Sequence, residues 1–263
     1  MPTFESIDWY EQARCYDIIF DAETKKEADF LEAVGARFGP FRGRRVLEPA
    51  CGTGRLVAEM AKRGWKVTGF DICGSALEYA RSRLARRRLS SSLFRAEMQS
   101  FRLPADSFDF AHCLVSTFKY LMTEADARAH LRAAARTLTP GGVYVLGLHL
   151  TDYADRRCNR ERWIARRGGT EVVCNIQGWP PDPVLRTERV RARLIATSRS
   201  RERRFETNWT FRTYDVDELR TTLRAAPALE HVATFDFHHD IDQPRELDGQ
   251  LLDAVLVLRK RAT

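Results

Sequence analysis

The chain has 263 residues and a formal net charge of +7, and its length suits one large α/β domain that carries an insertion. Only six of its 43 basic residues are lysines, and an arginine excess of this kind can follow from genome base composition, so the charge argues only weakly for a nucleic-acid partner. No apolar stretch approaches membrane-spanning length and the amino-terminal segment lacks the features of a signal peptide, so we expect a cytoplasmic protein that binds no membrane.

Six cysteines are dispersed along the chain, and no two of them have the spacing of a zinc ribbon or a redox pair. We therefore expect reduced thiols. His238 and His239 have side chains that can bind metal, but adjacent histidines on a strand point to opposite faces. We expect a loop at this position and no bound metal.

The first 43 residues favour a helical appendage, 1–43, with helices predicted at 7–20 and 24–38. From residue 45 onward the pattern alternates between strands and helices, which is typical of a doubly wound parallel sheet. The predicted strands are 45–49, 66–71, 93–97, 107–116 and 143–150. Helices are predicted after the first, the second and the fourth of these strands.

The pattern changes after residue 150. Segments with alternating apolar and polar residues then predict antiparallel strands at 171–177, 187–197 and 204–213. We interpret 151–214 as an inserted antiparallel β cover and the whole chain, 1–263, as a single domain.

A further helix is predicted after Asp215, where Glu218 completes a capping box. Two strands, at 230–237 and 251–258, follow with no helix between them. Strands connected in this way must pair antiparallel or lie apart.

The most informative segment is 46–55, which reads VLEPACGTGR and joins an apolar run to a tight turn and then to a helix. Gly52 and Gly54 let backbone N–H groups approach a ligand without a Cβ in the way, and the helix offers its positive end. Glu48 would repel the pyrophosphate of a dinucleotide but would attract the ammonium and sulfonium groups of S-adenosylmethionine. Val57 stands where the nicotinamide fingerprint requires its third glycine, so that fingerprint fails.

Further segments follow this turn in a recognisable order: VTGFDIC, RAEMQSF, SFDFAHCLVSTFKYL and LTPGGVYVLGL. Together with VLEPACGTG, they make the chain resemble a class I S-adenosylmethionine-dependent methyltransferase. The resemblance implies an α/β fold with a Rossmann-like, doubly wound sheet of seven strands, in the order 3-2-1-4-5-7-6 with the last strand antiparallel. It also implies S-adenosyl-L-methionine as cofactor, S-adenosyl-L-homocysteine as product, and no metal.

The same resemblance assigns cofactor-binding residues by their position in the motifs. The turn residues assigned to the cofactor are Glu48, Ala50, Cys51, Gly52, Thr53 and Gly54. Asp71, followed by Ile72, is expected to bind the ribose hydroxyls through charge-assisted hydrogen bonds. Glu97 and Met98 stand where an acid and an apolar residue bind the adenine, and the backbone carbonyl of Leu114 stands where the ammonium group binds.

Methyl transfer from a sulfonium is an in-line displacement, so donor and acceptor must be aligned about 3 to 3.5 Å apart with water excluded. His149 follows the fifth predicted strand and is a candidate base, with simple packing under the cover as the alternative. Tyr16 is a second candidate catalytic residue, and Tyr120 is a further candidate for ligand contact. Tyr10 and Tyr16 are six residues apart and do not share a helical face, so we expect core packing for at least one of them.

The favoured hypothesis is methyl transfer to a nitrogen or oxygen atom of a small organic acceptor, by a monomer or homodimer that does not bind nucleic acid. An RNA or protein methyltransferase is the alternative, but LVSTFKYL lacks both an N-P-P-Y motif for adenine amino groups and a Pro-Cys nucleophile. A third hypothesis is a protein that binds S-adenosylmethionine without catalysis.

Overall fold

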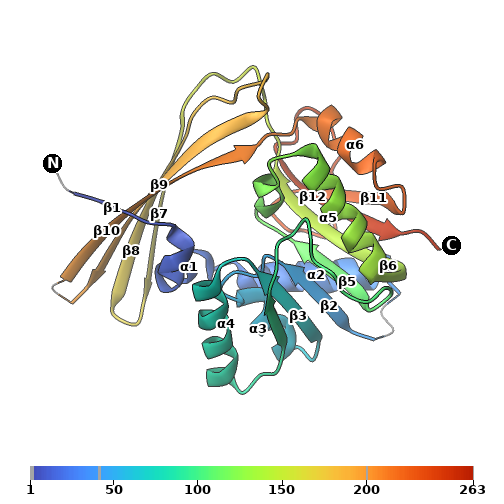
Figure 1. Cartoon of the computed structure of the whole chain (residues 1–263), viewed down its shortest axis with the longest axis horizontal. Coiled ribbons are helices and arrows are strands. Elements are labelled where there is room, and N and C mark those ends of the chain that lie inside the picture. The colour runs from blue at the N-terminus through green and yellow to red at the C-terminus, as the bar shows by residue number, and fades with distance from the viewer. Residues whose placement is uncertain (1–2, 41–42, 200, 263) are drawn as a thin grey trace.

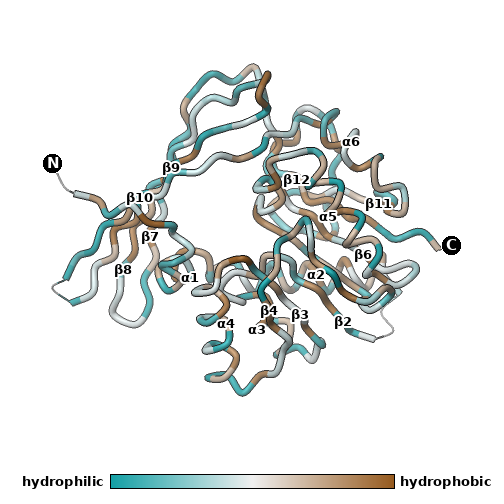
Figure 2. The backbone as a smooth tube through the Cα atoms, viewed as in Figure 1, coloured by the Kyte–Doolittle hydropathy of each residue, from teal (hydrophilic) through white to brown (hydrophobic). Residues whose placement is uncertain are grey.

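The computed structural model describes residues 3–40, 43–199 and 201–262. Two sheets organise the fold, one of seven strands at the centre and one of five strands beside it (Figure 1). Hydrophobic residues follow the strands of the central sheet, whereas the free end of the second sheet is mainly hydrophilic (Figure 2). The central sheet therefore provides most of the hydrophobic core.

The central sheet has the predicted topology. Its strands are β2 (Arg45–Pro49), β3 (Lys66–Asp71), β4 (Ser92–Arg95), β5 (Phe108–Cys113), β6 (Leu138–His149), β11 (Leu229–Phe235) and β12 (Asp253–Lys260). They are arranged in the order β11-β12-β6-β5-β2-β3-β4, and β12 pairs antiparallel with both of its neighbours while the other pairs are parallel. Numbered along the chain, this is the order 3-2-1-4-5-7-6 with the last strand antiparallel, which confirms the predicted α/β Rossmann-like sheet.

Helices cover both faces of the central sheet because each presents an apolar stripe of residues three and four positions apart. They are α2 (Thr24–Phe38), α3 (Arg55–Lys62), α4 (Gly74–Arg87), α5 (Glu124–Thr137) and α6 (Val216–Arg224). Helix α1 (Ala13–Phe20) and the short 3-10 helix η1 (Trp9–Gln12) pack instead against the second sheet, and a further 3-10 helix, η2 (Thr117–Tyr120), follows β5. One face packs against α2, α3 and α4 through buried residues such as Leu31 and Val57. The other face packs against α5 and α6 through Leu131 and Leu219.

The starts of α6 and α1 test two predictions made from the sequence. The capping box of Asp215 and Glu218 is present at the start of α6, as predicted. The single helix predicted at 7–20 is wrong, because η1 and α1 are separated at Gln12, whose φ of −89° and ψ of 47° are not helical. Asp8 caps η1 separately by accepting a hydrogen bond from the backbone N–H of Tyr10 (3.0 Å).

The second sheet contains the inserted strands. They are β7 (Asn159–Arg167), β8 (Thr170–Gly178), β9 (Thr187–Ser198) and β10 (Arg201–Arg212), and they form an antiparallel meander to which β1 (Glu5–Ser6) adds in parallel beside β10. The predicted antiparallel insertion is confirmed, but β7 and β1 were not predicted. Because β7 is an edge strand, its sequence NRERWIARR is mostly polar and lacks the alternation that identifies a half-buried strand.

The apolar face of this second sheet packs against η1 and α1. No helix in the described ranges combines the length and apolar character needed to span a bilayer. The division into an appendage (1–43), an insertion (151–214) and a single domain (1–263) stays a prediction. Parts of those ranges, namely residues 1–2, 41–42, 200 and 263, lie outside the described residues.

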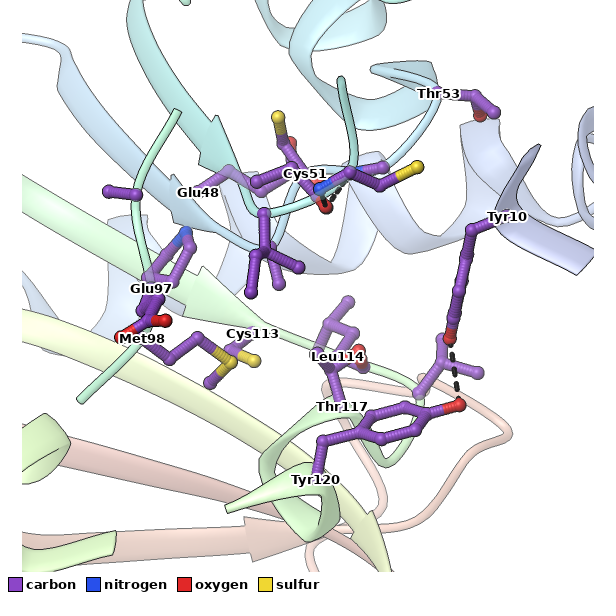
Figure 3. Close-up of a pocket in the computed structure, with 18 of the residues that line it drawn as sticks. Tyr10, Glu48, Cys51, Thr53, Glu97, Met98, Cys113, Leu114, Thr117 and Tyr120 are labelled. Atoms are coloured by element: carbon purple, nitrogen blue, oxygen red, sulfur yellow. Dashed lines mark hydrogen bonds between the residues drawn. The ribbon is translucent and has the colours of Figure 1, made fainter. Parts of the chain in front are cut away.

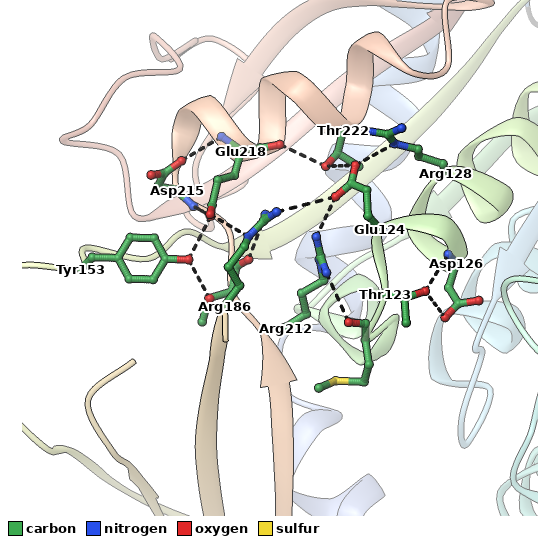
Figure 4. Close-up of polar contacts among 12 residues, drawn as sticks. Thr123, Glu124, Asp126, Arg128, Tyr153, Arg186, Arg212, Asp215, Glu218 and Thr222 are labelled. Carbon is green, nitrogen blue, oxygen red and sulfur yellow. Dashed lines mark hydrogen bonds and ion pairs between the residues drawn. The ribbon is translucent and has the colours of Figure 1, made fainter. Parts of the chain in front are cut away.

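Side chains from the ends of the central strands and from the amino-terminal segment face one another in Figure 3. On another side of the molecule, a polar network around Glu124 joins the inserted sheet to the core (Figure 4). Arg212, at the end of β10, donates to Glu124 Oε2 (2.7 Å), while Arg128 and Thr222 donate to Glu124 Oε1 (2.8 and 3.0 Å). Partial burial alone would raise the pKa of Glu124, but these donors outweigh it and lower the pKa.

Replacing Glu124 should therefore loosen the contact between the insertion and the core. We expect Glu124→Ala to lower the free energy of unfolding by about 2 kcal/mol, because Arg212 keeps little solvent exposure and loses its charge partner. Urea denaturation measures this change. Glu202→Ala, in a more exposed arginine pair on β10, is the matched control and should have little effect. Equal losses in the two variants would contradict the expectation.

Candidate active site

A cavity of about 390 Å³ lies at the carboxyl ends of β2, β3 and β5 (Figure 3). The order of the central sheet reverses between β2 and β5, so the loops that follow these two strands diverge and leave a crevice. The amino-terminal segment contributes Asp8, Tyr10 and Tyr16 to the same lining. Residues far apart in the sequence thus meet around one space.

The turn between β2 and α3 uses left-handed backbone at Ala50, Gly52 and Gly54, with φ of 53°, 51° and 67°. A Cβ added to Gly52 would meet no atom within 4 Å, so the backbone there is open to a ligand. A Cβ added to Gly54 would lie 2.8 Å from the Cβ of Ala80 on α4. The first glycine therefore keeps space free, whereas the second allows α4 to pack closely.

Asp71, at the end of β3, ties this turn to the next strand. Its Oδ2 accepts a hydrogen bond from the backbone N–H of Gly52 and its Oδ1 accepts one from the backbone N–H of Cys73, both at 2.8 Å. Burial raises the pKa of Asp71, although these hydrogen bonds act in the opposite direction. The carboxylate therefore has a structural role in the turn and also lines the cavity.

Glu48, at the end of β2, is the least compensated group in the lining. Its carboxyl is buried, and Oε2 has no hydrogen-bond partner among the described residues. Burial raises the pKa of Glu48 to about 8, and the lowering effect of Arg55 does not offset it. The Nε2 atom of His112 lies 4.0 Å away, but burial lowers the pKa of His112 to about 3, so this ring is neutral and forms no ion pair.

Arg55 brings a positive charge into the lining of the cavity. It ends the segment VLEPACGTGR, but no function was predicted for it from the sequence. It is the first residue of α3 and donates hydrogen bonds to Glu27 and to Thr24 Oγ1. Its position directly after Gly54 could have predicted this placement, because the first residue of a helix that follows a ligand-binding turn lies beside the ligand.

The loop after β4 brings Glu97 and Met98 to another part of the lining. Glu97 Oε2 accepts a hydrogen bond from Gln99 Nε2 (3.1 Å), and the Met98 carbonyl lies 3.0 Å from Nδ1 of His130. The other ring nitrogen of His130 lies 2.6 Å from the hydroxyl of Tyr144. Burial lowers the pKa of His130 to about 4, so a neutral imidazole that donates from Nδ1 to the carbonyl and accepts from Tyr144 satisfies all three groups.

The loop between β5 and η2 has strained backbone beside the cavity. Val115 and Ser116 both have positive φ, at 59° and 63°, and such a conformation costs a β-branched residue about 1 to 3 kcal/mol. Ser116 is held in place because its Oγ accepts a hydrogen bond from the backbone N–H of His149 (2.9 Å). The carbonyl of Leu114 accepts a hydrogen bond from Thr117 Oγ1 (3.3 Å).

Three tyrosines lie at the side of the cavity that faces the amino-terminal segment. The hydroxyl of Tyr10 donates to that of Tyr120 (3.0 Å; Figure 3). The ring centroids of Tyr10 and Tyr16 are 5.1 Å apart. Tyr10 and Tyr16 both pack against the hydrophobic cluster of the second sheet, which confirms the expected core packing, and both also reach the cavity lining. Burial raises the pKa of Tyr16 to about 12 and raises those of Tyr10 and Tyr120 too, so all three phenols are neutral near pH 7.

The structure does not bring His149 into this lining, and its role as a base stays a prediction. Its Nδ1 lies 2.7 Å from Asp253 Oδ1, and its ring packs against Phe237 with 4.8 Å between centroids. His149 pairs directly with Asp253 in the register of β6 and β12, and about half of each side chain is exposed. The end of β6 therefore directs the imidazole toward β12 and solvent.

Comparison with known proteins identifies the central part of the chain. Residues 46–142 match a family model described as a methyltransferase domain. This part of the chain is therefore similar to methyltransferase domains. The match confirms the resemblance found in the sequence motifs, and the predicted turn at 46–55 lies within it.

Relatives of the methyltransferase domain include enzymes named for work on small molecules. The chain is 35% identical to a ubiquinone biosynthesis O-methyltransferase of Idiomarina loihiensis, over 53% of this chain and 52% of that protein. It is 30% identical to a dTDP-3-amino-3,6-dideoxy-alpha-D-glucopyranose N,N-dimethyltransferase of Streptomyces fradiae, over 52% of each chain. The chain spans about half the length of the curated relatives it matches.

The fold extends beyond the matched residues. An S-adenosylmethionine-dependent methyltransferase from Clostridium acetobutylicum has a similar structure over 97% of this chain and 99% of its own, with a TM-score of 0.77 and 16% sequence identity. At that identity, the likeness supports the fold alone. It covers the inserted sheet as well as the methyltransferase domain.

The methyltransferase domain brings together nearly all of the predicted cofactor-binding residues. Those in the lining of the cavity are Glu48, Ala50, Cys51, Gly52, Thr53, Asp71, Ile72, Glu97, Met98 and Leu114. Gly54 is not among the lining residues, because it faces Ala80 of α4. Of the two predicted catalytic residues, Tyr16 lies in the lining and His149 does not. That these residues bind a cofactor or catalyse stays a prediction.

The two glycines of the turn should respond differently to alanine. Both substitutions place a side chain at positive φ, but Gly54→Ala also drives a methyl group into Ala80, so α4 must shift. We expect Gly54→Ala to lower the free energy of unfolding by about 2 kcal/mol more than Gly52→Ala does. Denaturant unfolding of both variants measures the difference. A larger loss for Gly52→Ala would contradict the packing role of Gly54.

Glu48 should make stability depend on pH. The folded protein holds the Glu48 proton up to about pH 8, whereas the unfolded chain releases it near pH 4.5, so the free energy of unfolding should fall as pH rises between these values. We expect Glu48→Gln to gain about 2 to 4 kcal/mol relative to the parent protein between pH 5 and pH 8, without ligand. Thermal or urea unfolding at both pH values measures this gain. If the difference in free energy of unfolding between Glu48→Gln and the parent is the same at pH 5 and pH 8, Glu48 has an ordinary pKa.

Proposed function

We propose that this protein transfers a methyl group from S-adenosyl-L-methionine to a nitrogen or oxygen atom of a small organic molecule. One observation carries the proposal: the buried Oε2 of Glu48 lacks a hydrogen-bond partner among the described residues and belongs to the cavity wall. A cationic group of a ligand would favour the ionised form of Glu48 and pair with it, whereas a pyrophosphate would find no such partner there.

The other lining residues fit the remaining parts of the same donor. The open backbone at Gly52 leaves room for its methionine end, and the carbonyl of Leu114 would accept a hydrogen bond from its ammonium group. Asp71 would accept from the ribose hydroxyls, and Glu97 from the adenine amino group. Arg55 carries the positive charge that the carboxylate of the donor requires.

The bound donor supplies an activated methyl group for in-line displacement. The chain itself then has to orient the acceptor and exclude water. The neutral hydroxyls of Tyr10 and Tyr16 line the cavity and would orient an acceptor through hydrogen bonds. Because the pKa of Tyr16 is about 12, we propose that it positions the acceptor and does not remove its proton. His149 lies outside the lining, and we assign no proton transfer to it.

The names of the relatives support a small acceptor. One is an O-methyltransferase of ubiquinone biosynthesis, and another is an N,N-dimethyltransferase of an amino sugar nucleotide. Both kinds of acceptor atom therefore occur among relatives, so the proposal keeps nitrogen and oxygen. It assigns no role to a metal, a nucleic acid or a membrane, and it applies to a cytoplasmic monomer or homodimer.

Calorimetric titration tests donor binding directly. We expect S-adenosyl-L-methionine and S-adenosyl-L-homocysteine to bind, and Glu48→Gln to raise the Kd for either of them at least about tenfold, because a buried charge-assisted contact is lost. Glu59→Gln is the matched control, since Glu59 is an equally buried glutamate of α3 that pairs with Arg63 outside the cavity lining. Its Kd should stay within about twofold of the parent value.

Turnover then tests the acceptor class. Methylation of amines or hydroxyl compounds from a small-molecule panel is the expected result. Binding of a nicotinamide dinucleotide without binding of the adenosyl donor would overturn the proposal. Donor binding without turnover on any acceptor would favour a silent binding protein, and methylation of RNA or protein alone would favour the alternative class.

A further inference from the structure

Asp17 of α1 lies outside the cavity lining but connects four parts of the molecule. Its carboxylate accepts hydrogen bonds from Thr53 Oγ1 (2.9 Å), from the hydroxyl of Tyr79 (3.0 Å), and from the guanidinium groups of Arg83 and Arg167. Thr53 belongs to the turn between β2 and α3, Tyr79 and Arg83 to α4, and Arg167 to the end of β7. One carboxylate thus connects α1, to which it belongs, with the turn, with α4 and with the inserted sheet.

The charge balance shows why this buried carboxylate is ionised. Asp17 is completely buried, and burial alone would raise its pKa. The two arginines and the Thr53 hydroxyl outweigh burial and lower the pKa, so Asp17 is negatively charged at neutral pH. A hydrogen bond to a charged acceptor is stronger than one between neutral groups, so the contact to Thr53 is a strong one.

The turn has left-handed backbone at Ala50, Gly52 and Gly54, which is strained at Ala50 and leaves the two glycines free to adopt other conformations, so contacts from outside would fix it. On the side of β3, Asp71 accepts a hydrogen bond from the backbone N–H of Gly52. On the side of α1, Thr53 is the residue of the turn that reaches Asp17. The hydroxyl of Thr53 donates its proton to the Asp17 carboxylate, although Thr53 also contributes to the cavity lining.

We propose that Asp17 is a positioning residue that holds Thr53, and with it the β2–α3 turn, in the conformation that binds the adenosyl donor. Arg167 extends the same contact to the inserted sheet, so the sheet supports the turn without touching the ligand. This inference rests on the proposed function, because the turn is assigned to the donor there. The competing explanation is that Asp17 only stabilises the packing of α1.

Thr53→Val separates the two explanations because it removes one hydroxyl and leaves Asp17 with Tyr79, Arg83 and Arg167. The side chain keeps its shape, so α1 should stay packed. Thr53→Ser is the matched control, since it keeps the hydroxyl and loses a methyl group. Titration with S-adenosyl-L-homocysteine should give a Kd about tenfold higher for Thr53→Val and within about threefold of the parent for Thr53→Ser.

Amide hydrogen exchange provides a readout that needs neither ligand nor activity. In the unliganded protein, we expect Thr53→Val to speed exchange in residues 51–54 several-fold, and Thr53→Ser to leave it close to the parent rate. Arg167→Gln should speed exchange in the same residues, because the sheet no longer supports Asp17. Asp109→Asn removes another buried aspartate with an arginine partner, Arg45 at the opposite end of β2, and should leave exchange in the turn unchanged.

The outcomes are distinguishable. If Thr53→Val binds the product as tightly as the parent and its turn exchanges at the same rate, the inference is overturned while the proposed function stands. If the parent protein binds neither donor nor product, the proposed function fails and the donor-positioning role fails with it. Exchange that rises in Asp109→Asn as much as in Thr53→Val would mean general destabilisation and would also overturn the inference.

Discussion

Three buried carboxyl groups surround the turn between β2 and α3, and each of them is compensated in a different way. Asp71 accepts hydrogen bonds from backbone N–H groups, and Asp17 is neutralised by the guanidinium groups of Arg83 and Arg167. Glu48 keeps an oxygen without a partner among the described residues. Asp71 therefore bonds to the turn directly and Asp17 bonds to it through Thr53, while Glu48 has a buried carboxyl oxygen with which a cationic ligand group would pair.

A site of this kind lowers the stability of the protein that contains it. Burial of Glu48 raises its pKa to about 8, which means that ionising this group works against the folded state. The positive φ of Val115 adds backbone strain in the lining of the same cavity. A buried carboxyl group without a partner and strained backbone in one cavity lining are typical of functional positions, where the surrounding fold offsets the loss of stability.

The inserted sheet provides part of that surrounding support. Its apolar face packs against η1 and α1, and Phe211 of β10 packs against Tyr120 with 4.7 Å between ring centroids. Lys119, next to Tyr120, pairs with Glu188 of β9 (2.5 Å). The alternating pattern of residues predicted β8, β9 and β10, but not β7, because a polar edge strand has no buried face to produce a pattern. The inserted sheet thus packs against residues that line the cavity or lie next to its lining.

By itself, the sequence determined the central sheet, its strand order and the glycine turn, because these depend on local periodicity and on a motif that resembles a known family. Only the tertiary structure decided how individual side chains are used. His149 turns toward Asp253 because of the register between β6 and β12, and Gly54 is needed because Ala80 of α4 packs against it. The missing partner of Glu48 likewise depends on groups from several strands and helices. Periodicity reports the conformation of a segment, whereas the direction of a side chain and the balance of its charge depend on neighbours that are distant in the sequence.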